Sequence, residues 1–89
     1  MGSYDDEIDE LRREIDELDA ELLKLVEERL KIVKRIGDVK RAAGLPTEDV
    51  EREERILRNM VLKSDLDEKF VRGLFKNIIE YCKDNERQC

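Results

Sequence analysis

The chain has 89 residues, of which 47% are charged and 4% aromatic, with one proline and four glycines. This composition is typical of long solvated helices and argues against a β-sandwich or barrel. A net charge of −6 argues against nucleic-acid or acidic-membrane partners. The absence of histidine excludes histidine acid–base chemistry and histidine metal ligation, and the two cysteines have no partners at metal-site spacing, so we expect no metal site. We therefore expect one all-α domain, too small to bury a large core by itself.

The first predicted element is a long helix over residues 5–43. Met1-Gly2-Ser3 resembles a cloning remnant, so we place residues 1–4 in a disordered leader and the domain at residues 5–89. Apolar residues then recur with heptad spacing for about five heptads, which is typical of a coiled-coil-like surface that we call the apolar seam. Its two columns are Ile8, Ile15, Leu22, Arg29, Ile36, Ala43 and Leu11, Leu18, Leu25, Ile32, Val39.

Two shorter helices follow. Gly44-Leu45-Pro46 ends the long helix, because glycine suits a left-handed C-cap and proline cannot continue the ladder. Thr47 or Asp49 can cap a second helix over 49–63, and the turn 64–67 precedes a third helix over 68–86. Their expected inward residues are Val50, Ile56, Leu57, Met60, Val61, Phe70, Val71, Leu74, Phe75, Ile78, Ile79 and Cys82.

The length of the first helix predicts the assembly. About 38 helical residues span roughly 57 Å, whereas a compact globule of this mass is about 30 Å across. Two short helices cannot cover a seam of that length, and an uncovered apolar stripe favours aggregation. We expect a second copy to cover it in an intertwined homodimer.

The cysteines and hydropathy indicate a cytoplasmic protein. Cys82 and Cys89 are seven residues apart, so on one helix their Cα atoms would lie about 10 Å apart, beyond disulfide reach. No apolar run approaches the roughly 20 residues of a membrane span.

An arginine interrupts the apolar seam. Arg29 occupies a position held by isoleucine, leucine or alanine in the other heptads, which is costly unless an anion meets it. Lys40 lies eleven residues further, about three turns along and only about 20° around the helix. Arg29 and Lys40 can therefore converge on one anion.

Two more charged residues bear on this site, each with two interpretations. Glu53 lies on the inward stripe of the second helix, where it could form a buried ion pair with Arg29 or contact a ligand. Arg12 lies about 25 Å from Arg29 along the helix, so it is either a solvated surface residue or reaches the Arg29 site of a partner subunit.

An ordered set of residues resembles the all-helical chorismate mutases. The resemblance covers essentially the whole chain. It is carried by Leu11-Arg12-x-x-Ile15-Asp16-x-Leu18-Asp19-x-x-Leu22-Leu23-x-Leu25-x-x-Glu28-Arg29, Val39-Lys40, Pro46-x-x-Asp49-x-x-Arg52-Glu53 and Leu74-Phe75-x-x-Ile78-Ile79-Glu80.

The resemblance implies an isomerase that rearranges chorismate to prephenate in aromatic amino acid biosynthesis, as an intertwined homodimer and without a cofactor or metal. By that similarity Arg29 and the partner's Arg12 hold the two substrate carboxylates, and Lys40 donates to the ether oxygen whose bond breaks. Glu53, with the backbone near Asp49, takes the ring hydroxyl. Arg52 is expected to support its neighbours.

The chain departs from the family near its C-terminus. Glu86 stands where the family usually has glutamine, and only a protonated glutamate could donate to the ether oxygen as the amide does. We therefore expect activity that rises toward acidic pH. Cys82 stands where relatives often carry a small polar residue, so it either packs in the core or contacts substrate.

Two other functions remain open. An isochorismate pyruvate-lyase-like enzyme would share the helical dimer and the cations, but the Asp49-x-x-Arg52-Glu53 segment resembles the mutases better. A non-catalytic dimerisation or regulatory module would use Arg29 only to set helix register.

Overall fold

The chain folds into three helices. The structure, a computed structural model, describes residues 3–88, with side chains described for residues 4–85. The helices are α1 (Ser3–Ala43), α2 (Val50–Leu62) and α3 (Glu68–Gln88), which confirms the all-α prediction of one long helix and two shorter ones. Within the described residues, none of the helices has the length and apolarity needed to cross a membrane.

The long helix α1 contains 41 residues. It begins at Ser3, so Ser3 and Tyr4 are helical in the structure and not part of the leader that we expected. Asp5 and Asp6 lie in its first turn, where negative charge offsets the helix dipole. Gly44 ends the helix with a φ of 70°, and the Leu45 amide donates to the Lys40 carbonyl at 2.8 Å.

Short acidic side chains cap the other two helices. Asp49 is the N-cap of α2, and its Oδ1 accepts a hydrogen bond from the Arg52 amide at 2.9 Å. At the start of α3, Asp67 Oδ2 accepts from the Phe70 amide at 2.9 Å. Each cap satisfies an amide that the helix itself leaves without a partner, so local sequence fixes where both helices begin.

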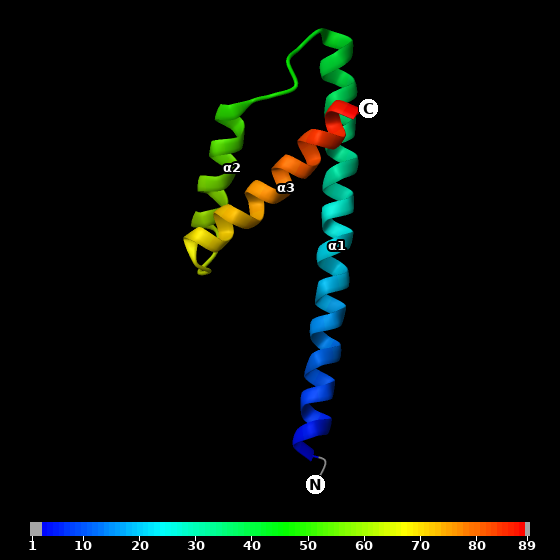
Figure 1. The fold of residues 1–89 in the computed structure, drawn as a ribbon, viewed down its shortest axis with the longest axis vertical. Coiled ribbons are helices and arrows are strands. Elements are labelled where there is room, and N and C mark those ends of the chain that lie inside the picture. The colour runs from blue at the N-terminus through cyan, green and yellow to red at the C-terminus, as the bar shows by residue number, and fades with distance from the viewer. Residues whose placement is uncertain (1–2, 89) are drawn as a thin grey trace.

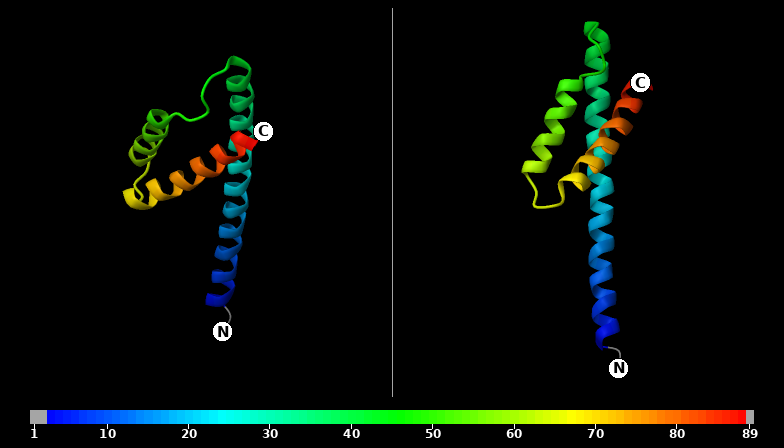
Figure 2. Two further views of the ribbon diagram at one scale, coloured as in Figure 1. Left: turned by 45° about the horizontal axis from the view of Figure 1, so that its top comes forward. Right: turned by 60° about the vertical axis from the view of Figure 1, so that its left-hand side comes forward.

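Helix α3 joins the other two. It crosses α1 and packs against α2, whereas α1 and α2 do not pack directly against each other in the described chain. Figure 1 shows the N-terminal part of α1 extending well beyond α2 and α3, and both views of Figure 2 agree. The resulting molecule measures 65 × 26 × 16 Å. The placement of α2 relative to α1 therefore depends on α3 and on the loop that connects α1 to α2.

The core of a single chain is small. Val71, Ile79 and Cys82 are its buried apolar side chains among the described residues. Val50, Phe70 and Leu74, which we expected to face inward, are exposed in the single chain.

The apolar seam of α1 remains uncovered within one chain. Its leucine, isoleucine and valine side chains are 44–65% exposed. This agrees with the expectation that the two short helices cannot cover the seam.

The C-cap of α1 provides a test of local conformation. We expect Gly44→Ala to lower the free energy of unfolding by about 1 kcal/mol, because an L-residue is strained at positive φ. No described atom lies within 4 Å of the added Cβ, so strain is the main contribution. Urea unfolding at fixed protein concentration measures the effect.

Gly73→Ala is the matched control. Gly73 lies inside α3, and a Cβ there also meets nothing within 4 Å, but its φ is helical. Alanine should therefore stabilise the helix by up to about 1 kcal/mol. Two substitutions with the same sign would contradict the assignment of Gly44 as a left-handed cap.

Candidate active site

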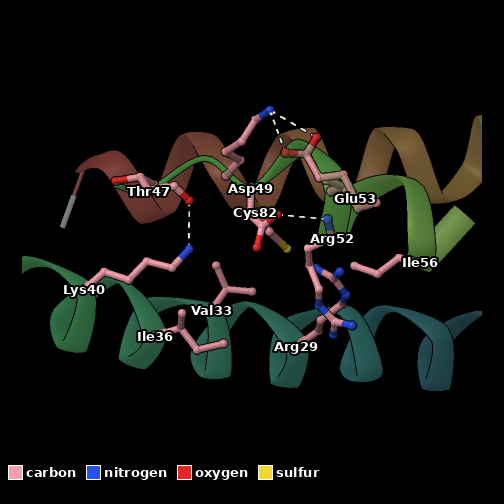
Figure 3. Close-up of a pocket in the computed structure, with 12 residues that line it drawn as sticks. Arg29, Val33, Ile36, Lys40, Thr47, Asp49, Arg52, Glu53, Ile56 and Cys82 are labelled. Atoms are coloured by element: carbon pink, nitrogen blue, oxygen red, sulfur yellow. Dashed lines mark hydrogen bonds and ion pairs between the residues drawn. The ribbon is translucent and has the colours of Figure 1, made fainter. Parts of the chain in front are cut away.

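A pocket of about 270 Å³ opens between α1, the loop after it, α2 and α3. All three helices and the loop contribute side chains to it (Figure 3). Its charged residues come from three separate segments, so the pocket exists only when the whole chain has folded. The lining residues are Arg29, Val33, Ile36, Lys40, Thr47, Asp49, Arg52, Glu53, Ile56, Ile79, Cys82 and Lys83.

The α1 wall has a cation at each end. Arg29, Val33, Ile36 and Lys40 recur at intervals of four, three and four residues, which places them on one helix face. The two apolar side chains separate the two charges along this face (Figure 3). Arg29 and Lys40 therefore line the same pocket.

Arg29 has no anionic partner within the described part of the chain. Its side chain is half-buried, and no described group forms an ion pair or hydrogen bond with it. The Arg29–Glu53 ion pair that we considered is not formed there, because Glu53 contacts Lys83 instead. A cation removed from water in this way favours binding of an anion in the pocket.

Lys40 is held toward the connecting loop. Its Nζ donates to the Thr47 carbonyl at 2.8 Å. The hydrogen bond directs the lysine side chain from α1 toward the loop (Figure 3). The loop therefore orients the cation, and the cation in turn fixes the loop.

Helix α2 contributes both signs of charge. Asp49 lies at its N-terminus, and Arg52 and Glu53 follow one turn later. Arg52, for which we expected a supporting role, lines the pocket, and Figure 3 shows its side chain directed toward that of Arg29. Two guanidinium groups facing one space increase its affinity for a carboxylate.

Helix α3 forms the apolar wall. Cys82 is 1% exposed and lines the pocket, so the two roles that we considered for this residue, packing and contact with a ligand, are compatible. Glu86 continues α3, but its side chain lies outside the described residues.

Arg12 lies far from this pocket in the same chain. Its side chain is 73% exposed, and it pairs with Asp9 at 3.8 Å on the extended part of α1. Seventeen residues of helix separate it from Arg29, which is about 25 Å. Arg12 of the same chain does not line the pocket.

Comparison with known proteins identifies the family. The family model described as chorismate mutase type II matches residues 11–87. The chain belongs to the type II chorismate mutase family. Chorismate mutases are isomerases, and this assigns the enzyme class. The comparison with curated proteins finds no match.

Solved structures agree with the family assignment. A chorismate mutase from Thermus thermophilus (form II) superposes with a TM-score of 0.86 at 34% identity, covering 91% of this chain and 94% of that one. Form I of the Thermus enzyme gives 0.82 at 33% identity, with coverages of 85% and 98%. A conserved hypothetical protein from Pyrococcus furiosus gives 0.75 at 35%, with coverages of 89% and 93%.

Sequence analysis of this chorismate mutase domain missed two pocket residues, the apolar Val33 and the charged Lys83. Lys83 Nζ lies 3.2 Å from Glu48 Oε1 and 3.3 Å from each carboxylate oxygen of Glu53. A signal was available, since Lys83 follows the buried Ile79 by four residues and so lies on the same face of α3. What spacing alone does not reveal is the pair of carboxylates on other segments.

The carboxylates of Glu48 and Glu53 shift the pKa of Lys83. The hydrogen bond to Glu48 and the contacts with Glu53 raise the pKa of Lys83 above its ordinary value of 10.5, while burial opposes them. The folded state therefore favours the protonated lysine.

The raised pKa predicts how stability depends on pH. Because the folded pKa of Lys83 exceeds the unfolded one, its stabilising contribution is full below pH 10.5 and disappears as the pH rises through the folded pKa. The stability difference between the wild type and Lys83→Met should accordingly shrink from pH 9 toward about pH 12. Urea midpoints at each pH measure it, and a difference that stays constant or grows would contradict the ion-pair assignment.

Proposed function

We propose that the chain rearranges chorismate to prephenate as a homodimer, in which Arg12 of each subunit completes the pocket of the other. Family membership supports the activity, and the pocket supports the binding mode. The single observation on which the binding mode depends is the half-buried Arg29, with which no described group forms an ion pair or hydrogen bond. A dicarboxylate substrate supplies the missing negative charge.

The exposed seam of α1 supports the dimer. Apolar side chains that are 44–65% exposed along a 41-residue helix form a larger apolar surface than a monomer ordinarily presents to water. An antiparallel second copy of α1 would cover the seam and bring its own Arg12 toward Arg29. The partner thus provides both the missing burial and the missing cation.

The cations are suited to hold the substrate by its charged groups. In this proposal Arg29 and the partner's Arg12 bind one carboxylate each, for which a guanidinium fork has the matching geometry. An ammonium has three N–H donors. Lys40 uses one for the Thr47 carbonyl, and we propose that another is directed at the ether oxygen when substrate is bound.

The opposite wall is suited to the ring hydroxyl. Glu53 is a carboxylate that can accept from a hydroxyl, and Asp49 lies one turn earlier at the N-cap of α2. We propose that both act at this end of the substrate. Cys82 and Ile79 form the apolar wall between the two ends.

The rearrangement requires the protein only to position the substrate and to stabilise the charge that develops. As the ether C–O bond breaks, a C–C bond forms within the same molecule, so no nucleophile or proton carrier takes part. Holding the substrate in its folded conformer removes much of the entropic barrier. Negative charge develops on the ether oxygen, and fixed cations around it stabilise the transition state.

We retain two proposals from the sequence. Glu86 is proposed to donate to the ether oxygen when protonated, in place of the glutamine usual in the family. A cytoplasmic location is proposed because a reducing compartment suits the free thiol of Cys82.

Arg29 provides the direct test of the catalytic proposal. We expect Arg29→Leu to lower kcat/KM for chorismate by about 10²- to 10³-fold, the usual effect of removing one charge-stabilising donor. Its free energy of unfolding should stay equal or increase, because an unpaired cation leaves an apolar layer. Loss of chorismate absorbance gives the rate, and urea unfolding gives the stability.

Arg13→Leu is the matched control, since Arg13 is exposed on α1 outside the apolar seam. It should leave the rate nearly unchanged. An Arg29→Leu protein that keeps wild-type activity would contradict the catalytic role and favour a purely structural one. Pyruvate release from isochorismate that exceeds prephenate formation would contradict the choice of reaction.

Mixed dimers test the shared site. Arg12→Ala and Arg29→Ala chains should each be inactive alone, because every pocket then lacks one cation. After refolding in equal amounts, about half of the dimers should contain one chain of each kind and one intact pocket, which restores about a quarter of wild-type activity. A verified mixed dimer without activity would contradict the sharing of Arg12.

A further inference from the structure

We propose that Lys83 is a positioning residue for the substrate, which holds the Glu53 carboxylate in place and ties the loop before α2 to α3. The inference depends on the proposed function, because it concerns how Glu53 meets chorismate. It adds a residue that neither the family motif nor the periodicity of α3 singled out.

The contacts of Lys83 span three segments. Its Nζ lies 3.3 Å from both oxygens of Glu53 on α2 and 3.2 Å from Glu48 Oε1 in the loop. The Lys83 and Glu53 side chains are only 18% and 25% exposed, so water screens their attraction less than that of a surface pair. The nearly symmetric contact defines the orientation of the carboxylate.

The arrangement of the helices makes the Lys83 contacts important for the geometry of the pocket. Because α1 and α2 do not pack against each other, the distance between Arg29 on one wall and Glu53 on the other is set by α3 and the loop. Lys83 lies where α3, α2 and the loop meet. Lys40 holds the other side of the same loop through the Thr47 carbonyl, so two lysines fix the segment that closes the pocket.

Charge balance gives Lys83 a second effect. An isolated Glu53 would repel a dicarboxylate entering the pocket. The adjacent ammonium offsets that charge, while the carboxylate retains lone pairs that can accept the ring hydroxyl. Lys83 therefore makes the Glu53 carboxylate compatible with a pocket that binds anions.

The proposed role predicts which kinetic constant changes. The ring hydroxyl carries no developing charge during the rearrangement, so a contact to it stabilises ground state and transition state alike. Losing such a contact raises KM and leaves kcat nearly unchanged. A general displacement of α3 would instead disturb Arg29 and Lys40 and lower kcat.

The experiment compares three variants with chorismate as substrate. Lys83→Met should raise KM about tenfold with kcat within about threefold, as expected for loss of one charge-assisted hydrogen bond. Lys83→Arg, which keeps the charge, should remain within about threefold of wild type in both constants. Lys69→Met is the matched control on an exposed position of α3 and should behave like the wild type.

A double-mutant cycle shows whether Lys83 acts through Glu53. In a Glu53→Gln background, Lys83→Met should raise KM by less than about threefold, because no carboxylate remains to be positioned. An undiminished tenfold effect there, a Lys83→Met protein equal to Lys69→Met, or a fall in kcat alone would each overturn the inference while leaving the proposed function intact. A wild type that converts no chorismate would overturn both.

Discussion

The folded chain is organised around a cation in an apolar layer. Arg29 occupies a seam position that hydrophobic residues hold in the other heptads, and no described group forms an ion pair with it, since Glu53 in the same pocket pairs with Lys83. Such an arrangement reduces stability unless a ligand supplies the anion. The same feature that weakens the free protein therefore creates affinity and, in our proposal, stabilises the developing charge of the rearrangement.

The length of α1 links fold, assembly and site. One rigid helix carries Arg12 at one end and Arg29 and Lys40 toward the other, and the intervening distance prevents a single copy from gathering all three around a small molecule. Antiparallel pairing would resolve this, and it would also bury the apolar seam. Helix α3 then has a separate task, which is to hold α2 opposite α1, since those two helices do not pack together.

Much of the fold, and part of the pocket, could be predicted from the sequence. Heptad spacing, the Gly44 and Asp49 signals and the turn over residues 64–67 are local, so the three helices were placed within two residues of their observed ends. The shared face of Arg29 and Lys40 also follows from helix geometry alone. Contacts between segments could not be predicted, because the spacing of residues within one helix does not determine which side chains of another helix they contact.

The charged residues of the pocket illustrate why contacts between segments could not be predicted. Glu53 was recognised as an inward carboxylate, but its partner proved to be Lys83 and not Arg29. Arg52 was expected to support its neighbours, and the structure places it in the lining of the pocket. Exposure of Val50, Phe70 and Leu74 likewise depends on the packing of whole helices.

Sedimentation equilibrium of the wild-type protein at micromolar concentration tests the central claim most directly. If a second copy covers the apolar seam and completes each pocket, the mass will be twice the 10.6 kDa of one chain, with no detectable monomer. A protein that sediments as a monomer while it converts chorismate would contradict the account, because one chain would then be sufficient for both the fold and the site.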